Sequence, residues 1–184
     1  MSDAVSALNG RVAAGGFATV AEAGLTGMLT IRAEFGSGAL KSALGGLGLA
    51  VPGQRGVVTS GGRTLAWMSP DELLLICGYD EAPGLATTLG DALAGEHALV
   101  VNVSDARARF TVSGPRADEV VMKLAPVDFA TLPQGEIRRT RTAQIAAALW
   151  RSGPEEITLV CFRSVGLYLM NLLETAARKG GEIF

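Results

Sequence analysis

The chain has 184 residues, enough for one domain or two small halves sharing a core, and 48% of them are apolar, so no disulfide staple is needed. Its net charge of −2 and aromatic content of 5% exclude a nucleic-acid-binding field and a polybasic membrane patch. Charged residues make up only 18%, against about 25% in a typical soluble domain. We therefore expect apolar surface that a permanent partner covers, although the abundant Gly and Ala explain the same composition.

The first residues are rich in Ala, Gly and Ser, and we expect residues 1–23 to be a flexible N-terminal arm. No basic segment followed by a dense apolar run occurs there, so no secretory signal is predicted. No later run approaches the ~18 apolar residues of a membrane-spanning helix. We therefore expect a cytoplasmic protein without a membrane partner.

Apolar and polar residues alternate over 29–35, which predicts a half-buried strand. Ser37 is a suitable cap for the helix that follows it. Strands are then predicted around Val57, over 65–67 and over the continuously apolar 72–77, which is typical of an interior strand. A helix with Leu85, Leu89 and Leu93 on one face follows, capped by Asp80.

The second half begins with strands over 99–103 and 108–112. Pro115 is pre-shaped for a first helical position, so a helix is predicted to begin there. The remaining predicted elements are strands over 138–144, 145–150 and 157–162, and a helix over 163–179 that Gly180 and Gly181 terminate.

The chain nearly repeats itself. Each copy reads as an apolar strand with Trp, a polar turn of Ser, Pro and Glu, and an apolar strand ending in Cys. Trp67 and Trp150 are 83 positions apart and Cys77 and Cys161 are 84 apart, so each pair is predicted to occupy equivalent positions. We expect an α+β fold made of an internally duplicated, folate-binding-domain-like unit, with antiparallel sheets and helices packed on one side. Residues 24–184 would form one duplicated domain with pseudo-repeats at about 24–97 and 98–184.

Residues that carry chemistry are scarce. His97 is the only histidine and lies in a loop-like context, and the two cysteines form no CxxC pair. The adjacent acids Asp71–Glu72 and Glu155–Glu156 are interpreted as turn residues, because no base or nucleophile accompanies them. The glycine-containing turns at 36–38 and 113–115 match no phosphate-binding loop and are interpreted as helix caps. We therefore expect no catalytic, cofactor-binding or metal-binding residue in this chain.

Arginines concentrate in the second half of the chain. A docking face is one interpretation, since Arg is enriched at protein interfaces; a solvated sheet face balanced by nearby acids is the other, and both stay open. The two tryptophans are predicted to be core or interface anchors. The predicted interface or structural residues are Trp67, Arg107, Arg109, Arg139, Arg141, Trp150 and Arg163.

A series of short motifs occurs in one order along the chain. It comprises Trp67-x-x-Pro70-Asp71-Glu72, Val101-Asn102-Val103-Ser104-Asp105, Ser113-Gly114-Pro115-Arg116-Ala117, Pro126-Val127-Asp128-Phe129, Gly135, Arg139-Thr140-Arg141-Thr142, Leu149-Trp150-Arg151 and Phe162-Arg163-Ser164. This series resembles the gamma subunit of bacterial heterotetrameric sarcosine oxidase. More distantly, the Asn-x-Ser and Gly-Pro-x-Ala motifs are similar to those of the folate-binding domain of glycine-cleavage aminomethyltransferases, which is itself an internally duplicated α+β unit.

The resemblance implies a non-catalytic subunit of a complex that oxidatively demethylates sarcosine to glycine, giving hydrogen peroxide and formaldehyde or methylene-tetrahydrofolate. It implies that FAD, FMN, NAD and tetrahydrofolate belong to the alpha and beta subunits and zinc to the delta subunit. The gamma subunit would pack chiefly on alpha and bind no cofactor. Three alternatives stay open: a subunit of a related N-methyl amino-acid dehydrogenase, such as one for N-methylglutamate; a free-standing folate-binding, aminomethyltransferase-like module; and a scaffold that has changed partners.

Overall fold

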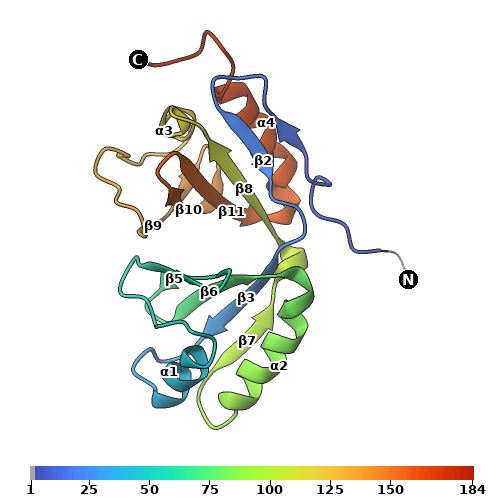
Figure 1. Ribbon diagram of the computed structural model, residues 1–184, viewed down its shortest axis with the longest axis vertical. Coiled ribbons are helices and arrows are strands. Elements are labelled where there is room, and N and C mark those ends of the chain that lie inside the picture. Colours follow the sequence, from blue (N-terminus) through green and yellow to red (C-terminus); the bar gives the residue numbers. More distant parts are fainter. Residues whose placement is uncertain (1–2) are drawn as a thin grey trace. The chain divides into compact units, whose positions relative to one another are not determined.

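The computed structural model describes residues 3–184, which form two compact units (Figure 1). Unit 1 combines the N-terminal segment up to Leu25 with Asp105–Phe184. Unit 2 comprises Thr26–Ser104. Each unit has its own antiparallel sheet and its own pair of helices.

Unit 2 holds a five-stranded sheet in the order β4-β5-β6-β3-β7. Every neighbouring pair is antiparallel. Its elements are β3 (Gly27–Arg32), α1 (Gly38–Gly45), β4 (Val57–Ser60), β5 (Arg63–Ser69), β6 (Glu72–Cys77), a 3₁₀ turn (Tyr79–Glu81), α2 (Ala82–Ala92) and β7 (Leu99–Asn102).

The sequence pattern explains why these elements form. Ser37 caps α1, with its Oγ accepting a hydrogen bond from the Leu40 N–H at 3.3 Å, as predicted. Strand β6 is buried along its whole length, as its unbroken apolar run predicted. Leucines of β3, β5 and β6 pack against Leu40 of α1 and Leu89 of α2, which places both helices on one face of the sheet.

Unit 1 holds a six-stranded antiparallel sheet in the order β1-β2-β8-β11-β10-β9. Its strands are β1 (Val12–Ala13), β2 (Thr19–Glu22), β8 (Arg107–Ser113), β9 (Ile137–Thr142), β10 (Ile145–Gly153) and β11 (Glu156–Phe162), and its helices are α3 (Ala117–Met122) and α4 (Gly166–Ala176). Short 3₁₀ turns at Ser104–Ala106 and Arg163–Val165 precede β8 and α4.

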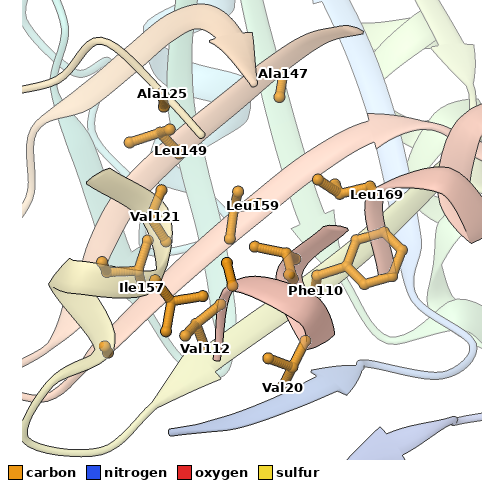
Figure 2. Close-up of a cluster of buried hydrophobic side chains, with 14 of the residues drawn as sticks. Val20, Phe110, Val112, Val121, Ala125, Ala147, Leu149, Ile157, Leu159 and Leu169 are labelled. Carbon is orange, nitrogen blue, oxygen red and sulfur yellow. The ribbon is translucent and has the colours of Figure 1, made fainter. Parts of the chain in front are cut away.

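The core of unit 1 lies between this sheet and its helices (Figure 2). Phe110 of β8 and Leu159 of β11 are fully buried at its centre. Leu169 of α4 and Val121 of α3 pack onto them from the helix side, and Val20 of β2 completes the cluster.

The two units repeat one arrangement. Strands β4, β5, β6, β3 and β7 of unit 2 have the same order and antiparallel pairing as β9, β10, β11, β8 and β2 of unit 1. The predicted α+β class, the internal duplication and the antiparallel sheets with helices on one side are therefore confirmed.

The edge strands come from different parts of the chain. Strand β7 follows the second helix of its own unit and pairs with β3, whereas β2 comes from the N-terminal segment and pairs with β8. Strands β1 and β2 thus fall within the segment expected to be an arm. The predicted strand over 99–103 joins the sheet of unit 2, although it lies beyond the predicted start of the second pseudo-repeat.

Two predicted helix starts are wrong by a few residues. Asp80 lies inside a 3₁₀ turn, and α2 begins after it with Glu81 as the capping position and no side-chain cap bond. Pro115 lies before α3, whose capping position is Arg116. In both places a tight turn contains the residue that was predicted to begin the helix, so the helix begins later.

Candidate protein interfaces

Four of the predicted arginines lie on one face of the six-stranded sheet, opposite the helices. Arg139 of β9 lies opposite Ala148 of β10, which lies opposite Val160 of β11. Val160 in turn lies opposite Arg109 of β8, so these four residues form one row on one face. Arg107 and Arg141 lie two positions along the same strands and share that face. We call this surface, with Arg107, Arg109, Arg139 and Arg141, the arginine face.

The arginines of this face differ in environment. Arg107 stacks over the ring of Phe162, 4.3 Å from its guanidinium carbon to the ring centroid. Arg109 is half-buried, and burial lowers the pKa of its guanidinium. Arg139 and Arg141 are exposed, and Arg141 donates to the Gln144 carbonyl at 3.4 Å. The arginine face therefore has a half-buried guanidinium, that of Arg109, and two exposed ones, those of Arg139 and Arg141. Between them lie the buried side chains of Ala148 and Val160.

The two tryptophans do not occupy equivalent positions, so that prediction is wrong. Leu65 of β5 and Leu149 of β10 both belong to the cores against the helices and are equivalent by strand register, 84 positions apart. The same offset makes Arg151, not Trp150, the counterpart of Trp67. A one-residue slip turns a strand residue to the other face. Trp67 shares the helix-covered face of its sheet, whereas Trp150 lies on the helix-free face of its own.

Arg163 is separate from the arginine face. It begins the 3₁₀ turn before α4, and its Nη2 donates to the carbonyls of Val5 at 2.8 Å and Ser6 at 3.0 Å. Its guanidinium thereby holds the N-terminal segment against unit 1, which is a structural role.

Sequence reasoning missed Arg151. Its guanidinium binds both carboxylate oxygens of Asp118 at 2.9 and 2.8 Å and donates to the Phe129 carbonyl at 2.9 Å. A bidentate pair of this kind fixes geometry as well as charge. Arg151 thus attaches the long loop between α3 and β9 to the sheet.

A groove in unit 2 was also missed. It has a volume of about 680 Å³ and lies where β3 ends, the β5–β6 turn passes and β7 begins; its lining includes Phe35, Pro70, Leu99, Arg32, Asp71 and His97. The only sequence signal was the adjacent pair Asp71–Glu72, which was interpreted as turn solvation. In the structure both carboxylates accept hydrogen bonds from Arg32, each at 3.0 Å.

The charges at this groove are held in place. The Ser69 hydroxyl donates to Asp71 at 2.6 Å and, together with Arg32, lowers the pKa of that carboxyl below its ordinary value. His97 is exposed at the rim. The groove therefore has apolar lining residues, such as Phe35 and Leu99, beside the ion pairs of Arg32 with Asp71 and Glu72.

The cysteines are free and buried. Burial raises the pKa of the Cys77 thiol, and raises that of the Cys161 thiol to about 11. Neither thiol has the depressed pKa of a nucleophile. Within residues 3–184, no group of three or more His, Cys, Asp or Glu side chains is placed to hold a metal ion. Nor does any helix in that range combine the length and apolarity that crossing a bilayer requires.

Comparison with known proteins identifies the same family as the motif series. The model of the "Sarcosine oxidase, gamma subunit family" matches residues 33–179. Sarcosine oxidase subunit gamma of an Arthrobacter species is 36% identical over 129 residues, which cover 68% of this chain and 63% of that protein. The match thus spans less than two thirds of that relative's length.

Two solved structures share the fold. A chain of heterotetrameric sarcosine oxidase from Corynebacterium sp. U-96, in complex with pyrrole 2-carboxylate, superposes with a TM-score of 0.82 at 27% identity, covering 94% of this chain and 90% of that chain. Glycine cleavage system aminomethyltransferase T from Bartonella henselae superposes with a TM-score of 0.59 at 15% identity, covering 83% of this chain and 44% of that chain. At this identity the second likeness shows the fold alone.

Proposed function

Because the chain belongs to the sarcosine oxidase gamma subunit family, we propose that it is a non-catalytic structural subunit of a heterotetrameric sarcosine oxidase complex. That complex would demethylate sarcosine oxidatively to glycine and produce hydrogen peroxide, with the one-carbon unit leaving as formaldehyde or methylene-tetrahydrofolate. The observation that carries the proposal is the superposition, at a TM-score of 0.82, on 90% of a chain of a heterotetrameric sarcosine oxidase.

The surface of the chain supports a role in assembly. Phe162 on the arginine face is half exposed, and large apolar side chains are also exposed on α4 and β7: Leu167, Tyr168, Leu99 and Val101. Aromatic residues and Arg are enriched at protein interfaces. We propose that the arginine face is one of the surfaces that dock on a partner subunit.

The partners would be the alpha, beta and delta subunits, with alpha the chief contact. FAD, FMN, NAD and tetrahydrofolate would be bound by alpha and beta, and zinc by delta. The complex would work in the cytoplasm.

Co-expression tests this role. Homologues of the alpha, beta and delta subunits are expressed with this chain and without it, and the tagged alpha subunit is purified. We expect all four chains to co-purify and the omission of this one to reduce both assembly and sarcosine turnover. Unchanged assembly and turnover without it would contradict the proposal. Assaying the same complex with N-methylglutamate distinguishes the related dehydrogenase.

The likeness to aminomethyltransferase T favours a second candidate, a folate-binding module. Titration of the purified chain with tetrahydrofolate separates the two functions. Saturable, stoichiometric binding by the isolated chain would favour the module, whereas the structural-subunit proposal expects none.

A further inference from the structure

The two units differ at the equivalent edge of their sheets. In unit 1, β1 lies beside β2 as an additional strand and pairs with it antiparallel through Val12 and Ala13. In unit 2 the equivalent strand, β7, ends the sheet in the described part of the chain (Figure 1). The chain thus supplies an added strand at one edge and leaves its counterpart open.

The backbone of β7 is oriented for a further strand. The Val103 N–H donates to the Met28 carbonyl of β3 at 2.8 Å, so these two residues form a hydrogen-bonded pair. Pairs of this kind alternate along an antiparallel ladder, which makes Val101 another inward-bonded residue. The alternation directs the N–H and C=O groups of Val100 and Asn102 away from β3.

The side chains of β7 are unusual for a free edge. Leu99 is 52% exposed and Val101 39% exposed, and both lie on the helix-free face. Proteins ordinarily protect open edges with charged residues, Pro or bulges. Strand β7 contains none of these, since its four residues are Leu, Val, Val and Asn. An apolar, unprotected edge is what β-strand addition requires.

The groove described above begins at this strand. Leu99 lines it together with Phe35 and Pro70, and Arg32 is fixed beside it by Asp71. A strand added to β7 would pass the groove at the Leu99 end. The groove then offers a pocket for one of the alternate side chains of that strand, which is how strand addition acquires specificity.

We propose that β7 accepts an extended segment of a partner subunit as an additional strand, with one apolar side chain of that segment in the groove. The identity of the partner rests on the proposed function. The segment pairs with β7 as β1 pairs with β2, and it carries apolar residues at alternate positions.

A second copy of this chain fits the edge less well. If two β7 strands paired antiparallel, the residues after Asn102 of one copy would meet the groove of the other. The first of these are Val103, which is half-buried, and Ser104, which is buried, with its Oγ accepting from the Met28 N–H at 3.0 Å. A second copy therefore places no fully exposed apolar side chain there.

Residue-resolved amide hydrogen exchange tests the proposal on the assembled complex and on the free chain. We expect the Val100 and Asn102 amides to exchange more slowly in the complex. The Val101 amide, which points toward β3, should be protected in both states and is the internal control.

A pair of variants tests the side chains. Val101→Lys places a charge on the open edge, and Val12→Lys does the same on β1, where Val12 is 60% exposed. We expect Val101→Lys to weaken assembly about tenfold or more, because the burial of a Val side chain is lost. Val12→Lys should assemble like the wild type, and unchanged thermal unfolding of both free variants shows that they fold.

The outcomes are distinguishable. A wild-type complex that forms without protecting Val100 and Asn102, or that Val101→Lys leaves unaffected, overturns the inference while the proposed function stands. Protection in the free chain that rises with concentration indicates a second copy and also overturns it. Failure of the wild-type chain to join any complex defeats the proposed function itself.

Discussion

At the scale of single residues, the two tryptophans show how little separates a core position from the opposite face. Their spacing of 83 positions differs by one from the 84 that relates the cysteines and the paired leucines. Because side chains alternate along a strand, this difference places Trp67 and Trp150 on opposite kinds of face. The spacing of 83 positions already indicated that the two tryptophans are not equivalent, although the residues around them are similar.

Trp150 and Trp67 are therefore expected to differ in their contribution to stability. Trp150 is 4% exposed, whereas Trp67 is only half-buried. Trp150→Ala should lower the free energy of unfolding by about 3–5 kcal/mol, and Trp67→Ala by clearly less, because less buried contact is removed. Urea denaturation measures both; equal losses would contradict the difference in burial between the two side chains.

The Cys161 thiol predicts a pH dependence of stability. Its pKa is raised to about 11 by burial, so the folded state favours the neutral thiol. The resulting stabilisation is complete below the ordinary thiol pKa of 9.0 and is lost as the pH rises from there through the folded value. The loss amounts to about 2–3 kcal/mol.

Measuring the free energy of unfolding of wild type and Cys161→Ala between pH 8 and 11 isolates this contribution. We expect the wild type to lose stability more steeply over that interval, since other groups titrate equally in both proteins. Parallel curves would mean that the thiol is accessible to solvent.

At the scale of elements, the N-terminal segment is attached to unit 1 by specific polar contacts. The carboxylate of Glu22 on β2 is 4% exposed and accepts hydrogen bonds from the Ser6 Oγ at 2.9 Å and the Gly10 N–H at 2.7 Å. Arg163 binds the carbonyl groups of Val5 and Ser6 from the other side. A buried carboxylate with two donors anchors the chain more firmly than its Gly- and Ser-rich composition indicates.

Replacing Glu22 with Ala should release residues 5–10. The buried Ser6 hydroxyl loses its acceptor, which costs about 1–3 kcal/mol if it stays unsatisfied. The exposed Gly10 N–H loses the shorter of its two hydrogen bonds. Limited proteolysis should therefore cut this segment faster in Glu22→Ala than in the wild type. Glu174→Ala, which removes only the exposed ion pair with Arg11, is the matched control; equal cleavage of the two variants would refute the anchor.

At the scale of the whole molecule, the duplication is completed by a strand from the chain's own beginning. In the described part of unit 1 no strand follows α4, and β2 takes the place that β7 takes in unit 2. Val20 of β2 is fully buried in the core of unit 1. The N-terminal segment is thus part of the folding unit rather than an appendage.

Truncation tests this arrangement. A chain beginning at Thr26 lacks β1 and β2, exposes the edge of β8 and loses the burial of Val20, which alone contributes about 1.5–3 kcal/mol. We expect its thermal unfolding midpoint to fall well below that of a chain beginning at Arg11, which retains both strands. Similar midpoints for the two truncated chains would show that β2 adds little to unit 1.

Much of the fold could be predicted from local pattern. Ser37 capped its helix and the apolar run 72–77 became an interior strand, because caps and alternation depend on neighbouring residues. The four-residue strand β2 escaped prediction, since Thr, Val, Ala and Glu among glycines and serines give no clear period. Of the predicted interface residues, four arginines and Trp150 share a face, while Arg163 and Trp67 lie elsewhere.

The sequence by itself determined the order of the elements from β3 onward, the α+β class, the duplication and the family, since periodicity, caps and short motifs are properties of consecutive residues. Only the tertiary structure decided that β2 joins β8, that β7 ends its sheet with an open edge, and that Arg32, Phe35 and Leu99 meet at one groove. Strand pairing joins residues far apart in the chain, and its register depends on burial across whole sheets. No local pattern contains that information.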